Sequence, residues 1–300
     1  MNPSPQNHPD LPRTALVLGG GGSAGNAWLI GVIAGLHDGG LDVSDADLIV
    51  GTSAGSTAAL QITGAPPARL YADIVDAPPR PRPATGGAHR GPIPVDHLAR
   101  TAAIIAASTG LEDMRRRMGA GAVELLDASD GTWNDQWRAT VATRLPSPDW
   151  PGRRILITAV DADTGEPVVF DRASGVSPVD AVAASCAGGL PFAIGERRYI
   201  DGGYRTNAEN ADLAAGARRV LVLSPFGGRS RLPQEWGAWL EAQLTELRAR
   251  GSEVDTIYPD AASLAAFGDN MMDLATRIPA ARAGHALGRS LAETLGAFWR

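Results

Sequence analysis

Two short apolar runs near the start of the chain are each followed by a glycine turn and then by a helical pattern. The runs cover residues 14–18 and 48–50 and are rich in Leu and β-branched residues. Runs of this length that alternate with helical patterns are typical of a parallel sheet. We therefore predict two strand–turn–helix units. Their glycine turns should lie at the carboxyl edge of the sheet, where open α/β folds bind their ligands.

Further apolar segments continue this alternation to the end of the chain. They predict strands at 153–160, 167–170, 199–201, 219–224 and 254–258, and helices at 26–37, 56–62, 177–185, 210–217, 234–250 and 280–300. In the first of these helices Gly31 and Gly35 lie on one face, which allows another element to approach the backbone closely. The pattern predicts a single α/β domain over residues 13–300, preceded by a disordered arm at residues 1–12.

Residues 65–150 interrupt the strand pattern with helical segments. Helices are predicted at 66–77, 95–107, 111–118 and 133–145, and the prolines and glycines of 78–87 predict an exposed loop. We read 65–150 as a helical insertion over the edge of the sheet. Such a segment serves either as a lid over a site or as plain packing.

The composition narrows the class of protein. A net charge of -6 and a sequence pI near 5.4 argue against nucleic-acid binding. Cys186 is the only cysteine, so no intrachain disulfide can form. The start of the chain has no apolar signal segment, and no apolar run is long enough to span a bilayer. We expect a cytoplasmic location with transient contact to membranes left open. The oligomeric state is not determined by the sequence.

The second glycine turn has the pattern of a nucleophile elbow. Gly51-x-Ser53-x-Gly55 follows a predicted strand and precedes a predicted helix. Small residues on both sides let the chain turn tightly and leave the hydroxyl of Ser53 projecting. The spacing alone is common, but the strand–turn–helix setting makes it specific.

The first glycine turn has two possible functions. Its four successive glycines include Gly20, Gly21 and Gly22, whose backbone amides could stabilise an oxyanion at a helix N-terminus. Alternatively, Gly20-x-Gly22-x-x-Gly25 matches a dinucleotide-binding fingerprint. The acids at the distance expected for a ribose contact are then Asp42, Asp45 and Asp47. The run of glycines favours the oxyanion function, because each extra glycine costs backbone entropy.

A serine nucleophile needs a base, and the most suitable candidate is an aspartate. The five histidines, His8, His37, His89, His97 and His285, do not occur in a loop after a strand, where a hydrolase triad would place one. Asp201 ends a short predicted strand and is followed by Gly202 and Gly203, which allow its carboxylate to approach another loop. We therefore expect a dyad of Ser53 and Asp201.

Taken together, these motifs resemble the patatin-like phospholipases. The glycine run 19–25, the elbow 51–55 and the acid motif 201–203 occur in that family's order, and the likeness extends to residues 161–170 and 184–192. The resemblance implies a three-layer α/β/α fold with a mostly parallel central sheet. It also implies hydrolysis of lipid acyl esters through an acyl-enzyme, by a phospholipase, lysophospholipase or lipid esterase that uses neither metal nor organic cofactor.

Two positions depart from the family's pattern, and two other functions stay open. Ala24 stands where the family has an arginine, which removes a guanidinium that would brace the oxyanion loop or meet an anionic head group. Glu209 stands where the family tends to have a proline. The alternatives are a nucleotide-binding protein that uses the Gly20–Gly25 loop and a catalytically degenerate patatin-like binding protein.

Overall fold

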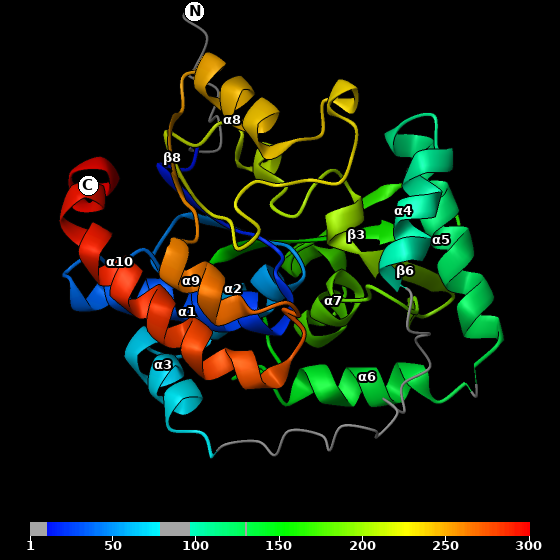
Figure 1. The fold of residues 1–300 in the computed structure, drawn as a ribbon, viewed down its shortest axis with the longest axis horizontal. Coiled ribbons are helices and arrows are strands. Elements are labelled where there is room, and N and C mark those ends of the chain that lie inside the picture. The colour runs from blue at the N-terminus through cyan, green and yellow to red at the C-terminus, as the bar shows by residue number, and fades with distance from the viewer. Residues whose placement is uncertain (1–10, 79–96, 130) are drawn as a thin grey trace, which may run out of the picture.

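A computed structural model describes residues 11–78, 97–129 and 131–300 (Figure 1). Most of the predicted N-terminal arm and of the proline-rich loop therefore lies outside the described residues. No helix in the described ranges is both long enough and apolar enough to cross a membrane.

The centre of the molecule is one mixed sheet, which has eight strands in the described part of the chain. Five neighbouring strands run parallel in the order β3, β2, β1, β7, β8, while β4, β5 and β6 are antiparallel to their partners. The strands are β1 (Thr14–Leu18), β2 (Leu48–Gly51), β3 (Arg154–Asp161), β4 (Pro167–Phe170), β5 (Phe192–Ile194), β6 (Arg197–Asp201), β7 (Arg219–Leu223) and β8 (Glu253–Ile257).

Helices cover both faces of this sheet (Figure 1). Alternate side chains of each strand point to opposite faces, so β1 buries Leu16 and Leu18 on one side and Ala15 and Val17 on the other. The helices are α1 (Gly22–Asp38), α2 (Ala54–Gly64), α3 (Pro67–Val75), α4 (His97–Ala107), α5 (Leu111–Asp127), α6 (Trp133–Ala142), α7 (Pro178–Ser185), α8 (Leu240–Ala249), α9 (Ala261–Phe267) and α10 (Arg277–Trp299). The face of Leu16 packs on α1, α2, α7 and α10, whereas α8 and, further along, α5 cover the opposite face. The result is the expected three-layer α/β/α arrangement.

The close approach predicted at Gly31 and Gly35 is made by the C-terminal helix. A Cβ atom on either glycine would collide with backbone atoms of α10, at Ala281 and His285 respectively. The contact is reciprocal, because a Cβ on Gly288 of α10 would collide with the backbone of α1. The first and last helices of the domain are therefore locked together along their backbones.

Several elements differ from the sequence prediction. The helix predicted at 210–217 is only a short 3-10 turn (Ala211–Ala214), because Asn210 adopts a left-handed conformation with φ +55°. The helix predicted at 234–250 is divided by Gly237, whose φ is +64°, into a 3-10 turn (Gln234–Trp236) and α8. Helix α5 continues beyond 118, and neither β5 nor α9 was predicted.

The helices of residues 65–150 lie around the sheet in three places. Helix α3 packs against α1 and α10, α5 packs against β3 and β6, and α6 packs against α7. A lid function for this segment stays a prediction.

Candidate active site

Strands β2 and β6 both pair with the same edge of β3, an arrangement that we call the fork at β3. It brings the elbow motif at the end of β2 close to the acid motif at the end of β6. Ile157 of β3 pairs with Gly51 of β2 on one edge and with β4 on the other. Ala159 pairs with Asp201 of β6 and again with β4, so β6 shares the edge of β3 that β2 occupies. Strands β2 and β6 therefore run toward each other, and their ends are two positions apart, about 7 Å along β3. Ser53 follows two residues after Gly51, at the end of β2 that faces β6.

Ser53 occupies a strained turn between β2 and α2. Its φ of +51° and ψ of -115° are unusual for a residue with a side chain. The turn is held by hydrogen bonds from the Ser53 amide to the Ser185 hydroxyl (2.9 Å) and from the Ser56 hydroxyl to the Ser53 carbonyl (2.6 Å). A Cβ on Gly55 would collide with the backbone of Leu18 in β1. The elbow predicted from the glycine spacing is thus present, and strain of this kind is typical of functional sites.

The hydroxyl of Ser53 lies near the carboxyl group of Asp201, close enough to influence its pKa. Asp201 is half-buried as a residue, but its carboxyl group is surrounded by protein. This burial raises the pKa of Asp201 to about 6, although the hydrogen bond from the Gly203 amide (2.8 Å) and the nearby hydroxyl of Ser53 act in the opposite direction. A carboxylate with this pKa is a stronger base than an exposed one and is still mostly ionised at neutral pH.

The glycine turn after β1 lies directly beside Ser53. A Cβ on Gly20 would be 3.5 Å from the Cβ of Ser53, and the Gly20 amide donates to the carbonyl of Ala208 at 2.8 Å. This amide is therefore already engaged. Gly21 is the cap of α1 and Gly22 is its first residue. In the part of the chain that the structure describes, neither amide donates a hydrogen bond to the protein. Of the three predicted oxyanion donors, Gly21 and Gly22 are the two with available N–H groups.

Sequence reasoning missed a buried polar network beneath the two motifs. The side-chain amide of Asn210 donates to the Gly202 carbonyl and to the Thr52 hydroxyl, both at 3.0 Å. The Thr52 hydroxyl also bonds Thr158 of β3 at 2.9 Å. The network thus connects the residue before Ser53 with the residue after Asp201. Asn210 adopts a left-handed backbone conformation, which directs its side chain toward these groups. The only sign of this conformation in the sequence is that asparagine tolerates it better than most residues.

A second buried acid lies beneath the first glycine turn. Glu209 is 1% exposed, and its Oε1 accepts a hydrogen bond from the Ser224 hydroxyl at 2.6 Å. A Cβ on Gly19 would be 3.2 Å from Cγ of Glu209. Burial raises the pKa of Glu209 to about 7. The structure therefore has two buried acids near the same site, Asp201 near Ser53 and Glu209 packed under the glycines.

Of the described histidines, His285 lies away from Ser53, whereas His97 lines a small cavity that reaches Gly188 near Asp201. His285 bonds Asp38 at 2.8 Å and stacks on Tyr71. Asp38 ends α1, about 24 Å along that helix from Gly22. Nε2 of His97 lies 3.5 Å from the Tyr204 hydroxyl.

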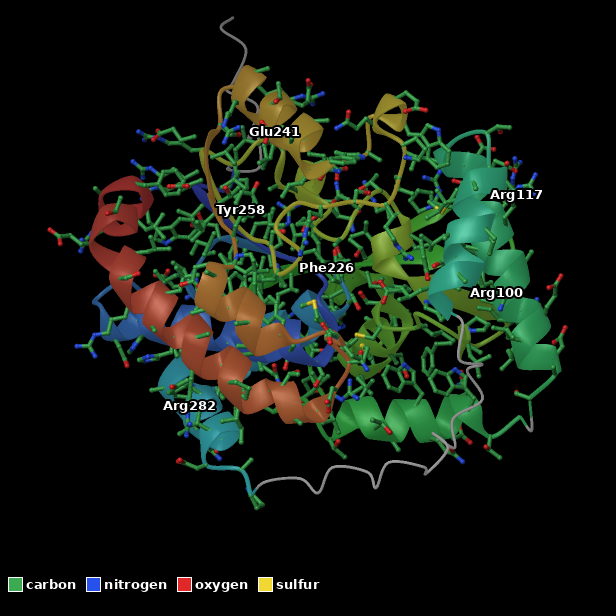
Figure 2. The ribbon with its side chains drawn as sticks, viewed as in Figure 1. Arg100, Arg117, Phe226, Glu241, Tyr258 and Arg282 are labelled. Carbon is green, nitrogen blue, oxygen red and sulfur yellow. The ribbon has the colours of Figure 1, made fainter. Side chains whose placement is uncertain are left out.

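A small cavity adjoins the dyad on the side of α4 and α5. Apolar side chains of Ile104 and Met118 line it together with the polar groups of Arg100 and Tyr204 (Figure 2 shows Arg100 on α4). The cavity also reaches Gly188, where a Cβ would be 3.8 Å from Oδ2 of Asp201. The cavity has a volume of about 20 Å³, which is room for about one water molecule. Within the described residues no group of three His, Cys, Asp or Glu side chains is arranged to hold a metal ion.

Comparison with known proteins gives one family. No curated protein matches the sequence. Among solved structures, VipD from Legionella pneumophila is similar with a TM-score of 0.43 and 12% identity. The alignment covers 94% of this chain and 66% of the VipD chain, so this chain spans less than two thirds of that protein. The sequence profile of the patatin-like phospholipases matches residues 16–214, well over half of the 300 residues. The chain therefore belongs to the patatin-like phospholipase family.

Proposed function

We propose that the protein hydrolyses lipid acyl esters with Ser53 as nucleophile and Asp201 as base. One observation supports this most strongly: the hydroxyl of the strained serine lies near a buried carboxyl group of raised pKa and beside a glycine turn with available amides. Membership of the family supports lipid acyl hydrolysis in general. The geometry supports the specific residues.

The reaction would proceed through an acyl-enzyme. Asp201 accepts the proton of the Ser53 hydroxyl while the oxygen attacks the ester carbonyl, and the amides of Gly21 and Gly22 stabilise the negative charge on the carbonyl oxygen. Collapse of this intermediate releases the alcohol, which takes the proton from Asp201. A water molecule then gives a proton to Asp201 and attacks the acyl group, and the carboxylic acid leaves as Ser53 regains its proton.

The test is covalent labelling with a fluorophosphonate, followed by mass-spectrometric mapping of the modified residue. We expect label at Ser53 in the wild type, with no label at residue 53 and no turnover of a p-nitrophenyl ester in Ser53→Ala. Ser290→Ala is the matched control, because Ser290 is an exposed serine on α10. Label at another residue, or unchanged turnover in folded Ser53→Ala, would contradict the proposal. A folded wild type that neither reacts nor turns over ester would favour the degenerate binding protein.

The dinucleotide alternative loses its support in the geometry. The carboxylate of Asp47 accepts hydrogen bonds from the amides of Arg13 and Thr14 at the start of β1, and that of Asp42 accepts from Ser44. Asp47 therefore lies at the amino edge of the sheet, whereas Gly20 follows the carboxyl end of β1. A ribose-binding acid would have to lie on the side of the glycines. Contact with a membrane surface stays a prediction.

A further inference from the structure

The glycine turn is held from outside by a segment near the C-terminus that the family profile does not reach. This segment comprises residues 268–277, between α9 and the start of α10. The carbonyl of Met271 accepts a hydrogen bond from the Ala24 amide at 2.9 Å. The side chain of Met272 lies against Gly22, where a Cβ would be 2.7 Å from the methionine sulfur. The first turn of α1 is thus covered by a loop far away in sequence.

The side chain of Arg277 also donates hydrogen bonds from this segment to α1. Its Nη1 donates to the carbonyl of Ser23 at 3.1 Å and to Oδ1 of Asn26 at 3.2 Å. Asn26 in turn uses its Nδ2 to donate to Oε1 of Gln61 at 2.9 Å and to the carbonyl of Ala54 at 3.4 Å. Because Arg277 fixes Oδ1 of Asn26, the Nδ2 group must face α2. A continuous set of hydrogen bonds therefore joins α10, the first turn of α1 and the residue after Ser53.

The hydrogen bonds of Arg277 are not needed to attach α10 to α1. The backbones of α1 and α10 are already in contact at Gly31 and Gly35. A cation at the N-terminal end of α1 is also unfavourable for the dipole of that helix. The same charge is favourable if negative charge develops at that end during the reaction, since it adds to the field of the Gly21 and Gly22 amides.

We propose that Arg277 is a positioning residue, which holds the amides of the glycine turn at a fixed distance from Ser53 by binding Ser23 and Asn26. The inference rests on the proposed function for its catalytic consequence. Arg277 also supplies a guanidinium group to a loop in which Ala24 provides none. Arg277 acts through the loop, by way of Ser23 and Asn26.

The experiment compares Arg277→Ala, Arg277→Lys and Arg282→Ala in the full-length protein. Arg282 is an exposed arginine on the same helix, labelled in Figure 2, and serves as the matched control. We expect Arg277→Ala to lower kcat for a soluble p-nitrophenyl ester by about tenfold to a hundredfold, because a small misplacement of catalytic groups has effects of that size. KM should stay within about twofold, and lysine should restore part of kcat.

A second readout does not depend on activity. Hydrogen exchange measured by mass spectrometry should be faster over residues 20–27 in Arg277→Ala than in wild type, and unchanged in Arg282→Ala. Unchanged exchange there, or an unchanged kcat in an active enzyme, would overturn the proposal. A wild type without esterase activity would instead contradict the proposed function, while the exchange measurement would still decide whether Arg277 holds the loop.

The relay through Asn26 is tested by a double-mutant cycle. Arg277→Ala combined with Asn26→Ala should lower kcat no further than the larger of the single changes, because both remove the same connection. Fully additive losses would show that Arg277 does not act through Asn26.

Discussion

The two glycine turns follow neighbouring parallel strands, yet they are built differently. In the turn around Ser53, a Cβ on Gly55 would collide with backbone atoms of β1, and one on Gly51 would be 2.7 Å from Cα of Ser56. In the turn after β1, the neighbours of Gly21 and Gly22 are largely the side chains of Pro225 and Met272, together with the Met271 carbonyl. The elbow is therefore part of the sheet's own packing. The first turn is shaped by segments from the last third of the chain.

This difference shows that two similar glycine patterns can be required for different physical reasons. At the elbow the glycines permit the fold, because backbone atoms cannot move aside without disturbing β1. At the first turn the nearest neighbour of a Cβ on Gly22 is the flexible side chain of Met272, which can move aside. The two turns should respond differently to the same substitution.

The largest effect should come from Gly55→Ala. Its methyl group would overlap the Leu18 backbone, so we expect destabilisation of at least about 3 kcal/mol and loss of soluble folded protein. Gly152→Ala is the matched control, since nothing lies within 4 Å of a Cβ at that glycine. Yield and thermal unfolding followed by circular dichroism measure the effect. A Gly55→Ala protein as stable as the control would remove the distinction between the turns.

Gly22→Ala should fold but lose activity. The φ of +61° at Gly22 costs an alanine about 1–2 kcal/mol, and the side chain of Met272 would have to move. Displacing one oxyanion donor typically lowers kcat by roughly a hundredfold to a thousandfold. Steady-state kinetics on a soluble ester, with unfolding curves on the same samples, check both parts.

Met272→Ala combined with Gly22→Ala separates crowding from backbone strain. If crowding by Met272 dominates, the double variant should regain much of kcat; if the backbone conformation dominates, it should stay as slow as Gly22→Ala. A Gly22→Ala protein with wild-type kcat would contradict the assignment of this amide to the oxyanion.

The local parts of this site could be predicted from the sequence, and the long-range parts could not. The elbow and the acid motif at Asp201 are visible because glycine spacing and strand ends are local features. The fork at β3 depends on register between distant strands, so the ends of β2 and β6 are brought together by pairing that no local pattern predicts. For the same reason Asn210 and Arg277 gave no recognisable signal.

Errors in the helix predictions have a related physical cause. Residues 210–217 and 234–250 have helical composition, but Asn210 and Gly237 adopt left-handed conformations that interrupt a helix. The side chain of Asn210 bonds the distant Thr52, whereas Gly237 forms a local turn with Gln234. The engaged amide of Gly20 likewise depends on the carbonyl of Ala208, in a loop that no local pattern places there. At Asn210, contacts with distant segments therefore override the local helix propensity.

Each of the two turns has a buried acid beside it. The pH dependence that these acids cause is the smallest of the effects expected here. Asp201 belongs to the elbow and has a pKa of about 6, whereas Glu209 lies under the first turn and has a pKa of about 7. A base must be ionised to accept a proton, so kcat/KM should fall about tenfold for each pH unit below 6 and level off above it. The measurement is kcat/KM for a soluble ester from pH 4.5 to 8.

Glu209→Gln identifies which acid sets this profile. The variant keeps an acceptor for the Ser224 hydroxyl and removes the ionisation under the first turn. We expect the midpoint of the acid limb to stay near pH 6, because the proposed base, Asp201, has a pKa of about 6. If the limb in the wild type lay near pH 7 and disappeared in Glu209→Gln, the acid beneath the first turn would control the rate. The elbow would then supply the nucleophile without supplying the titrating base.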